Sequence, residues 1–297
     1  MSIKIGLAIM AYGTPEKEED VEPYLKDIFK QKEVPKLILQ KTIERYRKIG
    51  FSPLNEITLR QSVLLQEELS RRGFNAAVTV GMKHWKPKIK TAIETLKKDN
   101  PNLLIGILMH PFFSVMGSKE YEEVFNESSN GMKRSFIDHW YNYEKLYDAW
   151  NQNMKEAIDS FNGSRFYTIF TSHGLPSSTE DTEYKKELEE FSAKLADRSG
   201  IKDFCLAYQN GEHKDWYKPE VNGKLWELKE KEVKNVLIVP IGYISESLET
   251  LYDIDIEYKE TASQLGINLH RVKCLDYSPL LISTISDAIA DSVDKNL

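Results

Sequence analysis

The chain has 297 residues; 41% are hydrophobic, 29% are charged, and the formal net charge is −6 at pH 7. This composition is typical of a globular protein long enough for two domains, and its acidic balance argues against a protein that binds duplex nucleic acid through a basic face. Cys205 and Cys274 are the only cysteines and lack a paired C-x-x-C spacing, which excludes a disulfide framework, a Cys-rich zinc site and a four-cysteine iron–sulfur cluster.

The first segment, MSIKIGLAIMAYG (1–13), has no basic leader, and its apolar run is too short for a signal peptide or a membrane span. No later stretch approaches the length of a span. We therefore expect a cytoplasmic protein without an integral membrane segment.

Apolar runs of strand length alternate along the chain with longer segments of helical periodicity. We expect strands at 3–10, 75–81, 103–109, 165–170, 203–208, 235–241 and 267–273, and helices at 16–31, 35–49, 55–72, 86–98, 143–160, 182–198, 218–232, 245–264 and 279–293. Strands that alternate with helices predict an α/β fold with parallel sheets flanked by helices.

The opening of the chain recurs near its middle. IKIGLAIMAYGTP (3–15) and RFYTIFTSHGLP (165–176) each place a short strand before an aromatic residue or His and then Gly-x-Pro. This weak repeat predicts two similar domains, 1–162 and 163–297, and leaves open whether the last helix (279–293) packs back on the first domain. Ligands of open parallel sheets bind beyond the carboxyl ends of the strands, where Tyr12 and His173 are expected, so two domains that face each other would direct both residues into one cleft.

Two of the segments at strand ends have both a structural and a functional interpretation. Tyr12, in MAYGTP (10–15), could simply pack in a loop, or its phenol oxygen could bind a metal. The segment HPFFSVMGSKEY (110–121) could be ordinary core, or an apolar loop that forms the wall of a site for a flat apolar ligand.

His173 lies in TSHGLP (171–176), after an apolar strand and before a glycine and a proline that favour a tight turn. It could merely bond a neighbouring carbonyl. An imidazole near carboxylates is also a suitable ligand for Fe²⁺ or Zn²⁺ and a suitable proton acceptor near neutral pH.

An acidic segment follows the strand expected at 235–241. In an α-helix over 245–264, Glu249, Asp253 and Glu257 would form one row, Glu246 would lie one turn earlier, and Asp255 would point elsewhere. Ser245 is expected as the N-cap, and the helix dipole would favour an acid such as Glu246 in the first turn. The row could be a solvated face, or a series of oxygen ligands that passes a divalent cation along.

The chain contains no Walker loop, G-x-G-x-x-G, G-x-S-x-G or H-E-x-x-H. Phosphoryl transfer, ordinary dinucleotide binding and the α/β-hydrolase mechanism therefore lose support.

Taken together, the motifs resemble those of the ferrochelatases, over nearly the whole chain. They are MAYGTP, RYRKIGFSPLNEIT (45–58), VGMKHWKP (80–87), TSHGLP and ESLETLYDIDIE (246–257). The resemblance implies two similar Rossmann-like domains with the active site in the cleft between them. It also implies a lyase of haem biosynthesis that inserts Fe²⁺ into coproporphyrin III or protoporphyrin IX with release of two protons.

The resemblance also implies roles for individual residues. His173 and Glu249 would be the catalytic residues and metal ligands, with Asp253 and Glu257 as a metal relay. Tyr12 would be axial to the product iron, as in the short, cluster-free ferrochelatases that act on coproporphyrin. The positions implied to contact the porphyrin are Tyr12, Lys30, Arg45, Tyr46, Ser52, His84, Val115 and Met116.

Some positions depart from the family pattern. A basic pair near the end of the first helix is replaced here by Phe29 and Lys30, so one contact to a propionate could be missing, and Gly174 stands where Ser is commoner. We expect a monomer that needs no cofactor and no iron–sulfur cluster, with ferrous iron and porphyrin as substrates. The alternatives are a chelatase that places cobalt or iron in sirohydrochlorin, and a non-catalytic protein that binds a tetrapyrrole or metal.

Overall fold

A computed structural model describes residues 3–179, 181–209 and 215–296 of the chain. The chain divides into two compact units, one comprising Met1–Pro111, Gly117–Trp140 and Asp276–Leu297, the other Phe112–Met116 and Tyr141–Leu275. The division comes earlier than the boundary expected at residue 162, because α6 (Glu144–Asp159) contacts α7 (Thr182–Arg198) and β7 (Asn235–Val239) of the second unit.

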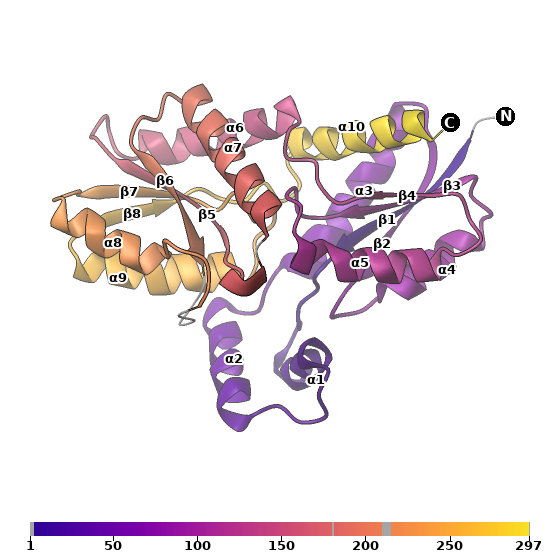
Figure 1. Ribbon diagram of the computed structural model, residues 1–297, viewed down its shortest axis with the longest axis horizontal. Coiled ribbons are helices and arrows are strands. Elements are labelled where there is room, and N and C mark those ends of the chain that lie inside the picture. Colours follow the sequence, from indigo (N-terminus) through magenta and orange to yellow (C-terminus); the bar gives the residue numbers. More distant parts are fainter. Residues whose placement is uncertain (1–2, 180, 210–214, 297) are drawn as a thin grey trace. The chain divides into compact units, whose positions relative to one another are not determined.

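The first unit contains a parallel four-stranded sheet in the order β2-β1-β3-β4. Its strands are β1 (Lys4–Ala11), β2 (Asn75–Met82), β3 (Leu103–Leu108) and β4 (Arg134–Ile137), and its helices are α1 (Glu18–Phe29), α2 (Lys36–Ile49), α3 (Leu54–Arg71), α4 (Ile89–Lys97), α5 (Val115–Ser128) and α10 (Pro279–Lys295). Figure 1 shows α3 and α10 on one face of this sheet and α4 and α5 on the other. The last helix therefore belongs to the first unit, where it contacts α3, β3 and β4.

The second unit repeats this arrangement with the order β6-β5-β7-β8. Its further elements are β5 (Tyr167–His173), the short helix η1 (Ser177–Thr179), β6 (Phe204–Gln209), α8 (Val221–Glu230), the π-helix η2 (Glu249–Tyr258), α9 (Lys259–Gln264) and β8 (Asn268–Arg271). In each unit the first strand lies between the second and the third. The internal repeat and the α/β class expected from the sequence are therefore confirmed.

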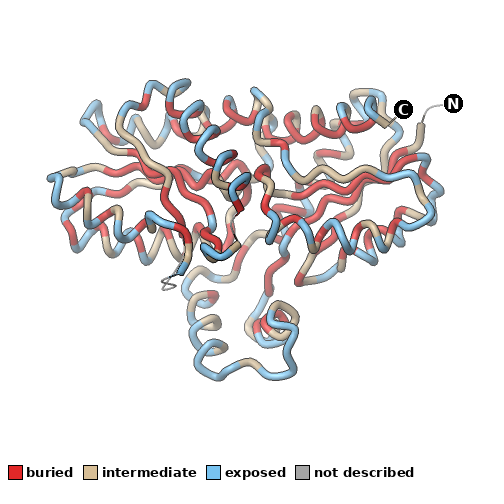
Figure 2. The backbone as a smooth tube through the Cα atoms, viewed as in Figure 1, coloured by how far each residue is buried: buried red, intermediate tan, exposed pale blue. Residues whose placement is uncertain are grey.

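The core of each unit follows from the apolar runs of its strands. Strands covered by helices on both faces are apolar throughout, and β1 and β3 are buried along nearly their whole length, as Figure 2 shows. In the second unit, apolar side chains of α8, η2 and α9 pack on one face of the sheet. Helix α2 is largely exposed for its length of 14 residues, because Tyr46 is its only buried residue.

Three elements differ from the sequence-based expectations. Strand β4 was not expected. The segment read as a loop at 110–121 is a loop only up to Ser114, because α5 begins at Val115. The α-helix expected over 245–264 is instead a π-helix from Glu249 to Tyr258 followed by the short α9.

The carboxyl ends of β5 and β7 approach each other closely, and this approach depends on Gly242. The Gly242 N–H donates to the Thr171 carbonyl at 3.1 Å. A Cβ at Gly242 would clash with Ser172 Oγ and would lie only 2.8 Å from Ser172 Cα. A glycine is therefore required where the chain leaves β7, next to the residue that precedes His173.

We expect Gly242→Ala to lower the free energy of unfolding by about 1–3 kcal/mol, the range for overpacking a tight interior site. Urea unfolding monitored by circular dichroism measures the change. Gly223→Ala is the matched control, because Gly223 lies in α8 and its Cβ would be at an ordinary 3.5 Å from Cγ of the N-cap residue Glu220. That control should be neutral or stabilising, and equal stability of the two variants would contradict the role assigned to Gly242.

Candidate metal and porphyrin site

His173 is the last residue of β5 and lies at the carboxyl edge of the second sheet. Its side chain is exposed, with its ring 5.6 Å from that of Trp216. Its backbone is fixed by Tyr184, whose hydroxyl donates to the His173 carbonyl at 3.0 Å and lies 2.5 Å from Ser172 Oγ. The strand end that carries the imidazole is therefore held by a buried tyrosine.

The hydrogen bond of the imidazole determines which ring nitrogen is open. Nδ1 of His173 lies 2.6 Å from the Gly174 carbonyl oxygen. A carbonyl can only accept, so Nδ1 carries the hydrogen, and the lone pair of the neutral ring is on Nε2. That nitrogen is available to bind a metal or to accept a proton.

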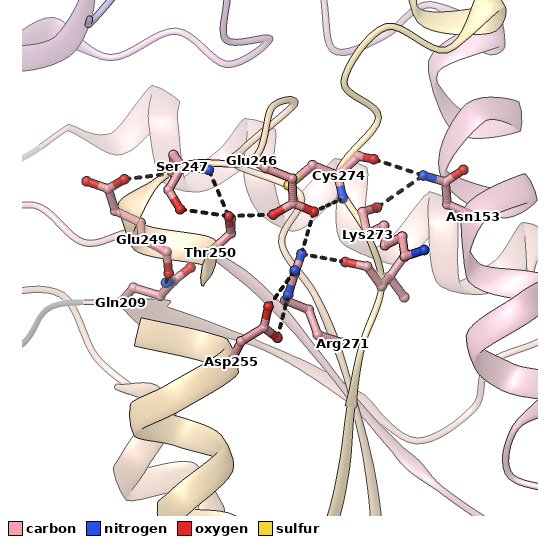
Figure 3. Close-up of polar contacts among 11 residues, drawn as sticks. Asn153, Gln209, Glu246, Ser247, Glu249, Thr250, Asp255, Arg271, Lys273 and Cys274 are labelled. Carbon is pink, nitrogen blue, oxygen red and sulfur yellow. Dashed lines mark hydrogen bonds and ion pairs between the residues drawn. The ribbon is translucent and has the colours of Figure 1, made fainter. Parts of the chain in front are cut away.

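Gln209 connects His173 with the acidic segment. It is the last residue of β6 and the cross-strand neighbour of His173. Its side-chain amide donates from Nε2 to the Glu249 carbonyl at 3.1 Å, and Thr171 Oγ1 donates to its Oε1 at 3.2 Å. Glu249, at the start of η2, is thereby tied to the sheet edge that carries His173. Figure 3 shows the contact between Gln209 and Glu249.

Arg271, at the end of β8, binds two of the acids of this segment. Its guanidinium donates to both oxygens of Asp255, at 2.9 and 2.7 Å, and from Nη1 to Glu246 Oε1 at 2.8 Å. The same Glu246 oxygen accepts from the Cys274 N–H, as Figure 3 shows. Burial alone would lower the pKa of Arg271, but these acids hold that pKa above its ordinary value. Glu246 and Asp255 therefore have a structural role. Asp255 points away from the row of Glu249, Asp253 and Glu257, as expected.

The remaining acids follow the π-helix. The Lys259 N–H donates to the carbonyl of Ile254, five residues earlier, as in a π-helix, whose turn is wider than an α-turn. Thr250, Ile254 and Tyr258 form its buried stripe. The residues immediately before these three are Glu249, Asp253 and Glu257. They form the acid row, in which Glu249 and Asp253 are partly buried and Glu257 is exposed.

The N-cap expected at Ser245 is wrong. Leu248 occupies the N-cap position and makes no capping bond with its side chain. Instead the turn closes through Thr250, whose Oγ1 accepts from the Ser247 N–H at 2.9 Å and donates to Glu246 Oε2 at 2.7 Å. Ser247 Oγ donates to Glu249 Oε2 at 2.8 Å and orients that carboxylate.

Two buried carboxylates of the second unit hold the segment 112–116. Asp181 Oδ2 accepts from the Val115 N–H at 2.7 Å and from Ser114 Oγ at 3.0 Å, while its Oδ1 caps α7. Glu187 accepts from the Phe113 N–H at 2.6 Å. With the backbone fixed in this way, the apolar side chains that follow are presented to solvent: Val115 is 48% and Met116 53% exposed.

In the first unit, Tyr12 and His84 lie together at the ends of β1 and β2. Their ring centroids are 4.6 Å apart, and the His84 N–H donates to the Tyr12 carbonyl. Burial lowers the pKa of His84 despite its bond to Asp27 at 2.8 Å. A neutral, fixed imidazole thus packs against Tyr12, which is 42% exposed.

The turn after Tyr12 depends on Gly13. Its φ is +83°, and a Cβ there would lie 2.6 Å from Trp85 Cβ. Thr14 is bound by Asn55 and by the hydroxyl of Tyr46, which accepts from Thr14 Oγ1 at 3.1 Å.

The other first-unit residues differ in exposure. Tyr46 and Ser52 are buried, and Arg45 is half-buried on α2. Lys30, just after α1, is exposed and pairs with Glu120 at 2.9 Å; Lys83 binds the other oxygen of Glu120. These two ammonium groups hold the pKa of Glu120 at about 2.

Gln209 and Arg271 were not singled out from the sequence. Gln209 could have been found, because it follows an expected strand in the same way as His173 does. Arg271 could not, since only the tertiary fold shows which acids it binds. Within the described residues, no three His, Cys, Asp or Glu side chains converge closely enough to hold a metal ion, and no helix has the length and apolarity needed to cross a membrane.

A family model described as Ferrochelatase matches residues 4–293. The chain is 31% identical to a ferrochelatase of Picosynechococcus sp., over 98% of this chain and 83% of that protein. It is 32% identical to the chloroplastic ferrochelatase-2 of Arabidopsis thaliana, over 98% of this chain and 64% of that protein.

Solved structures with a similar fold include the sirohydrochlorin chelatase SirB from Bacillus subtilis subspecies spizizenii in complex with cobalt. It has a TM-score of 0.62 and 10% identity, over 98% of this chain and 96% of that chain. CbiX, described as the terminal enzyme of sirohaem biosynthesis in denitrifying bacteria, has a TM-score of 0.58 and 11% identity, over 97% and 99% of the chains. At such identities the likeness shows the fold alone.

We expect Arg271→Met to lower the free energy of unfolding by about 3–5 kcal/mol, because it leaves the largely buried carboxylate of Glu246, and the partly exposed one of Asp255, without their counter-charge. The Arg271 side chain is 8% exposed and that of Glu246 12%. Arg165→Met is the control: Arg165 is 87% exposed and pairs with Asp203 at the surface, so its loss should cost less than about 1 kcal/mol. A loss for Arg271→Met as small as that of the control, measured by urea unfolding, would contradict the assignment.

Proposed function

We propose that this chain, which belongs to the ferrochelatase family and is therefore an enzyme that inserts Fe²⁺ into a porphyrin, uses His173 and Glu249 for the insertion and coproporphyrin III as its porphyrin. The observation that carries the residue assignment is Gln209. It pairs with His173 across the sheet and binds Glu249 through its side chain. An imidazole and a carboxylate are thus anchored to one edge of one sheet.

Metal insertion makes three chemical demands. Two pyrrole N–H protons must leave, the macrocycle must distort so that its nitrogen lone pairs face the metal, and the cation must lose its water in steps. Binding energy from remote parts of the porphyrin can supply the distortion, of order 1–5 kcal/mol. The first and third demands require a base and oxygen ligands.

His173 meets the first demand. Its Nδ1–H is bound to the Gly174 carbonyl, which leaves Nε2 as acceptor. This nitrogen takes a pyrrole proton or binds the iron before transfer. Glu249 is its partner, with a carboxylate oriented by Ser247.

Asp253 and Glu257 meet the third demand as a metal relay. They continue the row of Glu249 toward solvent, and Arg271 binds Glu246 and Asp255 rather than the acids of the row. Hard oxygen ligands that do not enclose an ion hold partly hydrated Fe²⁺ loosely, so that it can move on.

The porphyrin is contacted by apolar and basic side chains. We assign Tyr12 as axial ligand of the product iron, with its exposed ring held by His84. Val115 and Met116 supply apolar surface, and the exposed Lys30 supplies a cation for a propionate. Coproporphyrin III carries more propionates than protoporphyrin IX, so it gains more from such cations.

Arg45 is half-buried on α2, and we assign it as a further contact to the porphyrin. We assign the buried Tyr46 and Ser52 a supporting role: Tyr46 orders the turn after Tyr12 through Thr14, and Ser52 Oγ accepts from the Leu54 N–H at the start of α3.

The test mixes the purified protein anaerobically with Fe²⁺ and either coproporphyrin III or protoporphyrin IX and follows the visible spectrum. We expect faster turnover of coproporphyrin III, and His173→Ala should bind porphyrin but lose at least about 100-fold in turnover, the lower range for loss of a general base. Faster turnover of protoporphyrin IX would overturn the substrate assignment. Normal turnover by the variant would overturn the role of His173.

We expect Asp253→Asn to raise the KM for Fe²⁺ about fivefold, the equivalent of about 1 kcal/mol, because one relay charge is lost. The KM for porphyrin should change little. Glu260→Gln is the matched control, an exposed acid of α9 outside the row. An effect on porphyrin KM alone, or an equal effect of both variants, would contradict the relay.

A further inference from the structure

Tyr243 comes after His173 and before the acid row of Glu249, Asp253 and Glu257 in the sequence of the second unit. It follows β7 in the loop that leads to η2. Its neighbour Gly242 donates to the Thr171 carbonyl at 3.1 Å, which places this loop against the end of β5, next to His173. None of the roles assigned above involves Tyr243.

The Tyr243 hydroxyl is buried without a hydrogen-bond partner among the residues that the structure describes. Its ring is only partly covered, but the oxygen does not reach solvent. A buried hydroxyl that makes no hydrogen bond is unfavourable and rare, and such groups occur where an ion, a water molecule or a substrate completes the site.

Two acids of the row act electrostatically on this hydroxyl. Burial raises the pKa of Tyr243 well above its ordinary value, and the carboxylates of Glu249 and Asp253 raise it further. The hydroxyl is therefore neutral at working pH, with one hydrogen to donate and lone pairs to accept.

We propose that the Tyr243 hydroxyl binds the hydration shell of the divalent cation held by Glu249 and Asp253. It accepts a hydrogen bond from a metal-bound water, a partner that the described residues do not supply. The inference rests on the proposed function, of which it names a further cation-binding residue.

The scarcity of converging ligands supports this role. Among the described residues no three His, Cys, Asp or Glu side chains gather around one point, so an ion beside Glu249 and Asp253 keeps part of its water. Metal-bound water is a strong hydrogen-bond donor and needs an acceptor. A neutral phenol oxygen provides one without adding another charge that would retain the ion.

Tyr243→Phe tests the proposal because it removes only the hydroxyl. We expect the KM for Fe²⁺, and the Kd for Co²⁺ measured by calorimetry without porphyrin, to rise about fivefold, as for loss of one hydrogen bond. The porphyrin KM should stay constant. The melting temperature without metal should stay constant or rise, because an unpaired buried hydroxyl has been removed.

Tyr167→Phe is the matched control. Its hydroxyl donates to the Phe204 carbonyl at 3.0 Å, at the opposite end of β5, so its loss should lower the melting temperature without changing either metal constant. An unchanged Co²⁺ Kd for Tyr243→Phe, or a change in porphyrin KM alone, would overturn the proposal.

The outcomes distinguish the role of Tyr243 from the proposed function of the site. If His173→Ala and Asp253→Asn behave as expected while Tyr243→Phe binds Co²⁺ normally, only the role of Tyr243 fails. If His173→Ala turns over normally, the proposed function of the site fails, whatever the result for Tyr243.

Discussion

The pairing of Arg271 with two of the acids after β7 determines what the second unit can do. A buried guanidinium must be paired, and Glu246 and Asp255 satisfy it from two points of one segment. The pairing fixes the segment on β8 and engages the carboxylates of Glu246 and Asp255 in ion pairs. The acids of the proposed metal relay are not among those that Arg271 binds.

Contacts to the backbone position the candidate site residues of the second unit at one edge of its sheet. Gly242 lets β7 approach β5, Gln209 binds the first turn of η2, and Tyr184 fixes the carbonyl of His173. Each of these residues sets the position of a neighbour that carries the chemistry. Groups supported in this way keep their geometry, as the proposed transfer of a metal between them would require.

Much of this could be predicted from the sequence, because apolar strands, glycine turns and the internal repeat are local signals. His173 was expected at a strand end and is there. The π-helix could not be predicted, since acids four residues apart fit an α-helix equally well and the wider turn is set by packing. The boundary between the two compact units, which lies before α6, depends on tertiary contacts that no local pattern encodes. The same is true of the ion pairs of Arg271.

The π-helix sets how the acid row would respond to a deletion. A turn with i→i+5 bonds contains one residue more than an α-turn, so deleting a residue between Asp253 and Glu257 would let the segment rewind as an α-helix. Glu257 would then follow Glu249 by seven residues, about two α-turns, and would stay on the same face of the helix. In a regular α-helix the same deletion would rotate every later residue by about 100°, so the wider turn makes the row tolerant of losing one residue.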